Sequence, residues 1–104
     1  MSVLLEFAMF PTDQGESVSA YVSRVIEMIR ETGIPYQLTP MGTILETETL
    51  EQALAVVQQA GAVLGQAGCN RIYSSLKLDI RKGKSNRLQG KVASIQERIG
   101  EVAT

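Results

Sequence analysis

The chain of 104 residues is predicted to fold as one α+β domain, spanning residues 1–104, with helices packed on a four-stranded antiparallel sheet. Two segments with helical apolar spacing alternate with strand-like segments in the order strand, helix, strand, strand, helix, strand. A Pro-Met-Gly turn at residues 40–42 joins two short strand-like segments between the helices. A chain of this length has room for one modest hydrophobic core, which agrees with a single domain.

The first half of the chain supplies a strand, a helix and a strand pair. Residues 2–10 alternate in the manner of a strand, yet both faces are substantially apolar. A helix is expected to begin near Val18, where apolar residues recur at helical spacing, and to end at Gly33. The hairpin strands are expected within residues 36–48.

The second half begins with a capping box, in which Thr49 and Gln52 can satisfy backbone donors at a helix start. That helix is expected to end near Gly65 or Gly68. Residues 70–81 then alternate, and one face of this strand is predicted to lie on the core, a row formed by Ile72, Ser74, Leu76, Leu78 and Ile80.

Two further features follow the last strand. The basic residues of segment 81–87 are interpreted as a solvated turn. Apolar residues at helical spacing beyond it predict a short additional C-terminal helix, from Val92, Ile95, Ile99 and Val102.

This order of elements is typical of the split ferredoxin-like βαββαβ sandwich, with both main helices on one face of the sheet. Right-handed crossovers place the first strand between the third and the fourth. The opposite sheet face is therefore expected to lack a helical cover. Since the first strand is apolar on both sides, we expect a homo-oligomer in which open faces or sheet edges meet.

Composition excludes several classes of function. The formal net charge of −1 provides no basic field for nucleic acid, and no apolar run is long enough to cross a bilayer or resembles a secretion signal. The single cysteine, Cys69, agrees with a reducing compartment, so a soluble cytoplasmic protein is expected. Histidine is absent, which removes the usual general base and the commonest metal ligand. We therefore expect no enzyme, metal site or cofactor.

Four segments together resemble the small thiamine-binding, YkoF-like family: residues 15–22, the hairpin 36–43 with Glu46, the strand segment 75–79, and residues 90–92. The resemblance spans nearly the whole chain, and the Leu-Thr-Pro-Met-Gly-Thr hairpin is its most specific part. It implies a ferredoxin-like fold and assembly as a homodimer or homotetramer. It also implies non-catalytic binding of thiamine or a related pyrimidine, such as hydroxymethylpyrimidine or thiamine phosphate.

Several residues are candidates for a ligand site, each with a structural alternative. Glu6 is a carboxylate in an apolar strand, so it faces a ligand, forms an ion pair with Lys77 or Arg81, or pairs across an oligomer interface. Thr43 follows Gly42 and either offers its hydroxyl to a ligand or serves only as a strand residue. Met41 could line a ring pocket or fill a core or an interface.

The remaining candidates lie on the third and fourth strands and at the first helix. Glu46 could contact a ligand or be solvated, and Ser75, Lys77 and Asp79 form either a ligand-facing row or a solvated one. Ser17 and Ser19 could bind a phosphate at the helix start or act as caps. The candidate ligand-binding set is therefore Glu6, Met41, Thr43, Glu46, Ser75, Lys77 and Asp79, with Ser17 and Ser19 as possible phosphate contacts and no catalytic residue.

Two other functions are alternatives to ligand binding. An oligomeric interaction protein with no small-molecule ligand would use the open face for assembly alone. An acylphosphatase-like hydrolase is disfavoured, because such an enzyme needs an arginine in its phosphate loop and residues 11–17 contain none.

Overall fold

A computed structural model describes residues 1–104 and contains four strands and three helices. They follow one another as β1 (Ser2–Pro11), α1 (Ser19–Thr32), β2 (Tyr36–Thr39), β3 (Gly42–Thr47), α2 (Leu50–Gln66), β4 (Ile72–Arg81) and α3 (Arg87–Ile99). The strands form one sheet in the order β2-β3-β1-β4, in which every neighbouring pair is antiparallel. The predicted ferredoxin-like sandwich with an additional C-terminal helix is confirmed.

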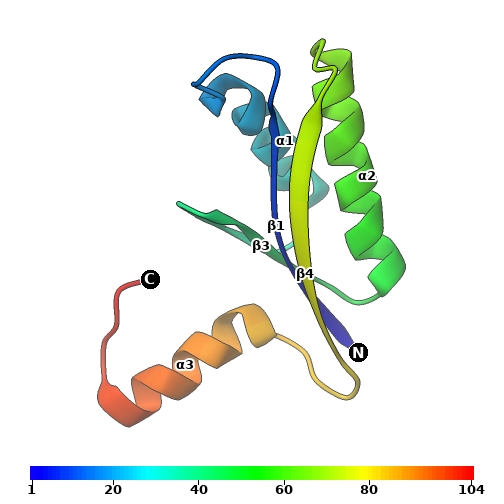
Figure 1. Cartoon of the computed structure of the whole chain (residues 1–104). Helices are drawn as coiled ribbons and strands as arrows, with labels where there is room; N and C mark the ends of the chain where they lie inside the picture. Colours follow the sequence, from blue (N-terminus) through cyan, green and yellow to red (C-terminus); the bar gives the residue numbers. More distant parts are fainter.

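The core lies between the sheet and the helices α1 and α2, which share one face of the sheet (Figure 1). β1 directs alternate side chains into this core, among them the fully buried Leu5. Ile29 of α1, Leu45 of β3 and Leu64 of α2 meet it there and are also fully buried. The period-two apolar pattern of β1 thus packs against the helical stripes of α1 and α2.

The two core helices begin differently. α2 has the predicted capping box, since Thr49 accepts a hydrogen bond from the backbone of Gln52 and the Gln52 amide oxygen accepts one from the backbone of Thr49. At α1 the cap position is held by Val18, and no side chain makes a capping hydrogen bond. The interpretation of Ser17 and Ser19 as caps is therefore wrong.

β4 differs from its prediction. Leu76, Leu78 and Ile80 lie opposite core residues of β1, so they point to the helix side of the sheet. They nevertheless remain 40%, 42% and 48% exposed, and Ser74 is exposed as well. The expectation of a buried face on β4 is wrong because α2 packs mainly against β1 and β3 and contacts β4 only marginally.

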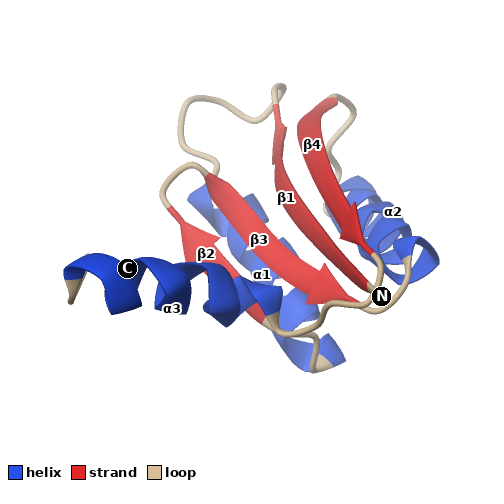
Figure 2. Ribbon diagram, turned by 90° about the horizontal axis from the view of Figure 1, so that it is seen from below, coloured by secondary structure: helices blue, strands red, loops and turns tan.

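α3 also differs from its prediction, because it begins at Arg87, inside the segment interpreted as a solvated turn. It lies on the face of the sheet opposite α1 and α2, so the expectation that this face has no helical cover is wrong for part of the sheet (Figure 2). The second half of α3 projects past the sheet, and its apolar residues Ile95 and Ile99 are 48% and 72% exposed.

Candidate functional site

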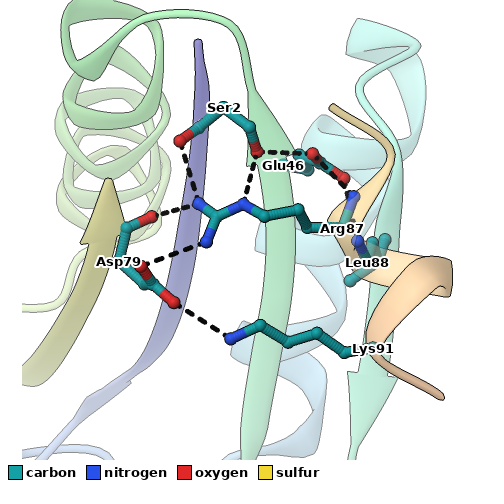
Figure 3. Close-up of polar contacts among 6 residues, drawn as sticks. All are labelled: Ser2, Glu46, Asp79, Arg87, Leu88 and Lys91. Carbon is teal, nitrogen blue, oxygen red and sulfur yellow. Dashed lines mark hydrogen bonds and ion pairs between the residues drawn. The ribbon is translucent and has the colours of Figure 1, made fainter. Parts of the chain in front are cut away.

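A buried arginine attaches α3 to the sheet (Figure 3). Only 5% of Arg87 is exposed. Its Nε donates to the Ser2 hydroxyl at 3.0 Å, and one terminal nitrogen donates to the carbonyl oxygens of Ser2 and Asp79 at 2.9 and 2.5 Å. The other terminal nitrogen lies 3.1 Å from the Asp79 carboxylate. One side chain from the start of α3 thereby joins the first residues of β1 to the end of β4.

Glu46 of β3 holds the amino end of the same helix. Its carboxylate accepts hydrogen bonds from the backbone amides of Arg87 and Leu88, at 3.0 and 2.9 Å, and from the Ser2 hydroxyl at 2.5 Å. Burial alone would raise the pKa of Glu46, but these three hydrogen bonds and the Arg87 charge outweigh it, so the pKa lies below its ordinary value. A carboxylate at a helix start is also favoured by the helix dipole.

Asp79 completes the attachment. It accepts a hydrogen bond from the Lys91 ammonium at 2.9 Å in addition to its contact with Arg87. The hydrogen bonds from Lys91 and Arg87 lower the pKa of Asp79. We call the set Ser2, Glu46, Asp79, Arg87 and Lys91 the α3 anchor.

A groove of about 440 Å³ lies between α3 and the open face of the sheet. Its apolar walls come from both sides, with Leu4 and Ile44 on the sheet and Leu88 and Val92 on the helix. Its charged lining comprises two carboxylates and three cationic side chains, namely Glu6, Asp79, Lys77, Arg87 and Lys91. This volume falls within the range of about 300–1,000 Å³ that is usual for ligand pockets.

The groove brings together three of the candidate residues, Glu6, Lys77 and Asp79. The carboxylate of Glu6 lies 3.6 Å from the Lys77 ammonium, and the two side chains are 46% and 85% exposed. The ion pair proposed as the structural alternative for Glu6 is therefore present, within the same groove as a possible ligand. Glu46 lies beside this region, but its carboxylate is engaged with the start of α3.

Met41 and Thr43 lie elsewhere, in a second pocket of about 320 Å³ between the β2–β3 hairpin and α1. Thr43 is opposite Phe7 of β1 and so points to the helix side of the sheet, whereas Glu6 points to the open face. Thr43 is 5% exposed, while Met41 at the hairpin tip is 88% exposed. We call this second cavity the hairpin pocket; its lining is mostly apolar and contains no charged side chain.

The three serine candidates line neither the groove nor the hairpin pocket. Ser75 lies on the open face opposite Ala8, two residue pairs beyond Glu6 and Lys77. Ser17 and Ser19 are both exposed near the start of α1. Ser19 lines a third cavity, of about 520 Å³, whose lining also includes Glu27 and Arg30. The structure therefore distributes the candidates over the groove, the hairpin pocket and the exposed surface.

Sequence reasoning missed the residues that α3 contributes, above all Arg87 and Lys91. One available signal was Leu88, which precedes Val92 at helical spacing and extends the apolar stripe of α3 back toward Arg87. A helix starting there would have placed Arg87 in an ordered segment instead of a solvated turn. Its burial still depends on contacts that only the tertiary structure creates.

The groove offers groups that can bind a ligand. Carboxylates, ammonium groups and apolar walls can orient a flat, charged organic molecule through ion pairs and ring contacts. No group of three or more cysteine, aspartate or glutamate side chains is close enough together to hold a metal ion. None of the three helices has the length and apolarity needed to cross a bilayer.

The fold and groove define a small ferredoxin-like α+β protein with a ligand-sized site beneath an extra helix. Residues 5–96 match the model of the family described as thiamine-binding protein, and the chain belongs to this family.

Relatives and solved structures agree with this assignment. A UPF0045 protein of Methanothermobacter thermautotrophicus is 36% identical over 83 residues, covering 80% of this chain and 84% of its own length. A Methanocaldococcus jannaschii protein of known crystal structure has 35% sequence identity to this chain. The two structures superimpose with a TM-score of 0.79 over 92% of this chain and 97% of the other. A Thermotoga maritima structure, provisionally assigned to thiamine biosynthesis or salvage, shares the fold at 23% identity and a TM-score of 0.78, with 91% and 99% coverage.

Proposed function

We propose that this protein binds thiamine or a related pyrimidine, such as hydroxymethylpyrimidine or thiamine phosphate, without catalysing a reaction. We further propose that it does so in the cytoplasm as a homo-oligomer. The observation that carries the proposal is the groove beneath α3, where Glu6 and Asp79 lie among apolar walls. Membership of the thiamine-binding protein family and the thiamine-related assignment of the Thermotoga maritima neighbour support the same ligand class.

The groove suits the two kinds of group that thiamine carries. Leu4, Ile44 and Val92 offer apolar surface to a flat ring. Because the Glu6–Lys77 pair is largely exposed, it contributes at most about 1 kcal/mol. A cationic thiazolium ring can therefore replace the Lys77 ammonium beside Glu6 at little cost. In a phosphorylated ligand the phosphate would interact with the ammonium groups of Lys77 and Lys91.

Isothermal titration calorimetry with thiamine, thiamine phosphate and hydroxymethylpyrimidine tests the proposal. Glu6→Gln removes the carboxylate while keeping its shape, and we expect thiamine to bind about five-fold more weakly, equivalent to about 1 kcal/mol. Glu51→Gln is the matched control, because Glu51 is exposed on α2 across the sheet from the groove. The absence of saturable binding by all three compounds to the wild-type protein would refute the proposal.

A second candidate function is an interaction protein that assembles with itself and has no small-molecule ligand. The half-exposed apolar residues of β4, together with Ile95 and Ile99 on α3, favour it. This alternative predicts a concentration-dependent oligomer whose thermal stability is unchanged by any compound in the panel.

A further inference from the structure

The positive charge of the chain is concentrated in one short stretch, residues 77–91. This stretch carries six of the ten lysine and arginine side chains but only one of the eleven carboxylates. The remaining residues carry four cationic side chains and ten carboxylates, so a local charge of +5 stands within a chain of net charge −1. Such a local excess attracts anions. The acidic remainder of the chain disfavours a long polyanion such as nucleic acid, so a small anion fits this charge distribution best.

Part of this charge surrounds a cavity of about 360 Å³ between the turn that follows β4 and the helix α3. Three exposed cationic side chains line it, those of Arg81, Lys84 and Lys91. Hydroxyl groups come from Ser85 and Ser94, and the lining contains a single carboxylate, that of Glu97. Only one of the ten lining residues is hydrophobic. We call this cavity the basic pocket, and its lining is suited to a small, strongly hydrated anion.

The cationic groups of the basic pocket differ in how they are engaged. Arg87 and Lys91 both contact the Asp79 carboxylate as parts of the α3 anchor. Arg81 and Lys84, by contrast, form no salt bridge with any carboxylate of the chain. Lysine and arginine bind phosphate oxygens through charge-assisted hydrogen bonds, which are stronger than neutral ones. Two cationic side chains at the basic pocket are therefore free to bind an external phosphate.

The basic pocket adjoins the groove beneath α3, because the linings of the two cavities share Arg87 and Lys91. Lys91 lies on the surface of α3 between Val92, which lines the groove, and Gly90, which lines the basic pocket. Its side chain extends from α3 to the Asp79 carboxylate, as Figure 3 shows. One oriented ammonium group thus borders both cavities, and a single ligand can extend from one cavity into the other.

We propose that the basic pocket binds the terminal phosphate of a diphosphate ester whose rings occupy the groove beneath α3. The groove itself supplies Lys77 and Lys91, which suffice for the first phosphate. The second phosphate lies beyond Lys91, where Arg81 and Lys84 offer the charges that the chain leaves unpaired. This inference rests on the proposed function and deepens it, because it names a diphosphorylated ligand, such as thiamine diphosphate, as the preferred member of the proposed class.

Isothermal titration calorimetry at fixed ionic strength with thiamine, thiamine diphosphate and inorganic pyrophosphate tests the basic pocket. Lys84→Ala should weaken the binding of thiamine diphosphate and of pyrophosphate about five-fold and leave that of thiamine unchanged. Lys82→Ala is the matched control, because Lys82 is an exposed lysine of the same turn that lines neither cavity. It should change each affinity less than about two-fold. Glu97→Gln should strengthen the binding of both phosphate compounds about two-fold by removing the one carboxylate of the pocket.

The possible results separate the basic pocket from the proposed function. Tighter binding of thiamine diphosphate than of thiamine, weakened by Lys84→Ala but not by Lys82→Ala, supports the inference. Equal losses in the two lysine variants would overturn it, because they would show a general attraction to the basic stretch and no site. Thiamine diphosphate that binds no more tightly than thiamine would also overturn it while leaving the groove as a thiamine site. If pyrophosphate binds through Lys84 and thiamine does not bind, the proposed function fails and the phosphate site stands.

Discussion

Replacing Arg87 by alanine tests whether the α3 anchor stabilises the whole molecule. The guanidinium donates to two oxygens of Ser2, a residue that is 2% exposed. Hydrogen bonds from a charged donor contribute about 1.5 kcal/mol each at the low end of their range, so the two bonds to Ser2 give about 3 kcal/mol. The bond to the Asp79 carbonyl oxygen is left out, so this value is a lower bound, and we add nothing for the Asp79 carboxylate, because it is 51% exposed and keeps Lys91 as a partner.

Urea unfolding followed by far-ultraviolet circular dichroism measures this loss, since the chain contains no tryptophan to report by fluorescence. Protein concentration must be equal in all samples, because assembly adds to apparent stability. The control is Arg98→Ala on the same helix, where the exposed guanidinium bonds only to the Ser94 carbonyl oxygen and the change should stay below about 0.5 kcal/mol. If the two variants unfold within 0.5 kcal/mol of each other, the anchor does not stabilise the fold as argued.

Three other measurements test separate parts of the structure. Because the pKa of Glu46 is lowered in the folded state, the ionised carboxylate stabilises the protein fully above pH 4.5, and this stabilisation is lost as the pH falls through the folded-state pKa. Glu46→Gln should therefore make the melting temperature less dependent on pH in this range, as measured by thermal melting from about pH 7 to pH 3. Gly42→Ala should lower the free energy of unfolding in urea by about 1–3 kcal/mol, because the added Cβ would lie 3.0 Å from the Phe7 carbonyl oxygen. Gly61→Ala in α2 is the matched control: its Cβ meets no atom within 4 Å, and the change should raise the free energy of unfolding by up to about 1 kcal/mol. Thr49→Ala should lower the free energy of unfolding by about 1 kcal/mol by removing the cap of α2, and an unchanged value would contradict the capping role.

Local signals were sufficient to predict the order of elements and the sheet topology. The alternation in β1, the capping box at Thr49 and the glycine after α1 are each decided by a few neighbouring residues. The exposure of the apolar face of β4 was not predictable in this way, because the sequence of β4 alternates like that of a strand with one buried face. Whether such a face is covered depends on where α2 packs, which the sequence of β4 does not encode.

The candidate site was predictable only in part, for a similar reason. The alternation along β1 and β4 predicts that Glu6 shares a sheet face with Lys77 and Arg81, and the register of the structure selects Lys77 as its direct neighbour. Thr43 lies on the helix side of the sheet, and Met41 lies at the hairpin tip. A resemblance of sequence segments does not tell to which side of the sheet these side chains point. The role of Arg87 depends on a helix crossing from far along the chain to Ser2, a long-range contact without a local signature.

The position of α3 in the chain sets the order in which the groove can form during synthesis. The sheet and its two core helices are complete at Arg81, whereas the groove needs residues that leave the ribosome later. Until then Leu4 and Ile44 face water, and the Glu46 carboxylate lacks the two backbone amides that later donate hydrogen bonds to it. A nascent chain can thus fold its sheet and two core helices before the groove exists, and a chain truncated before residue 87 would leave the apolar side chains of Leu4 and Ile44 open to other chains.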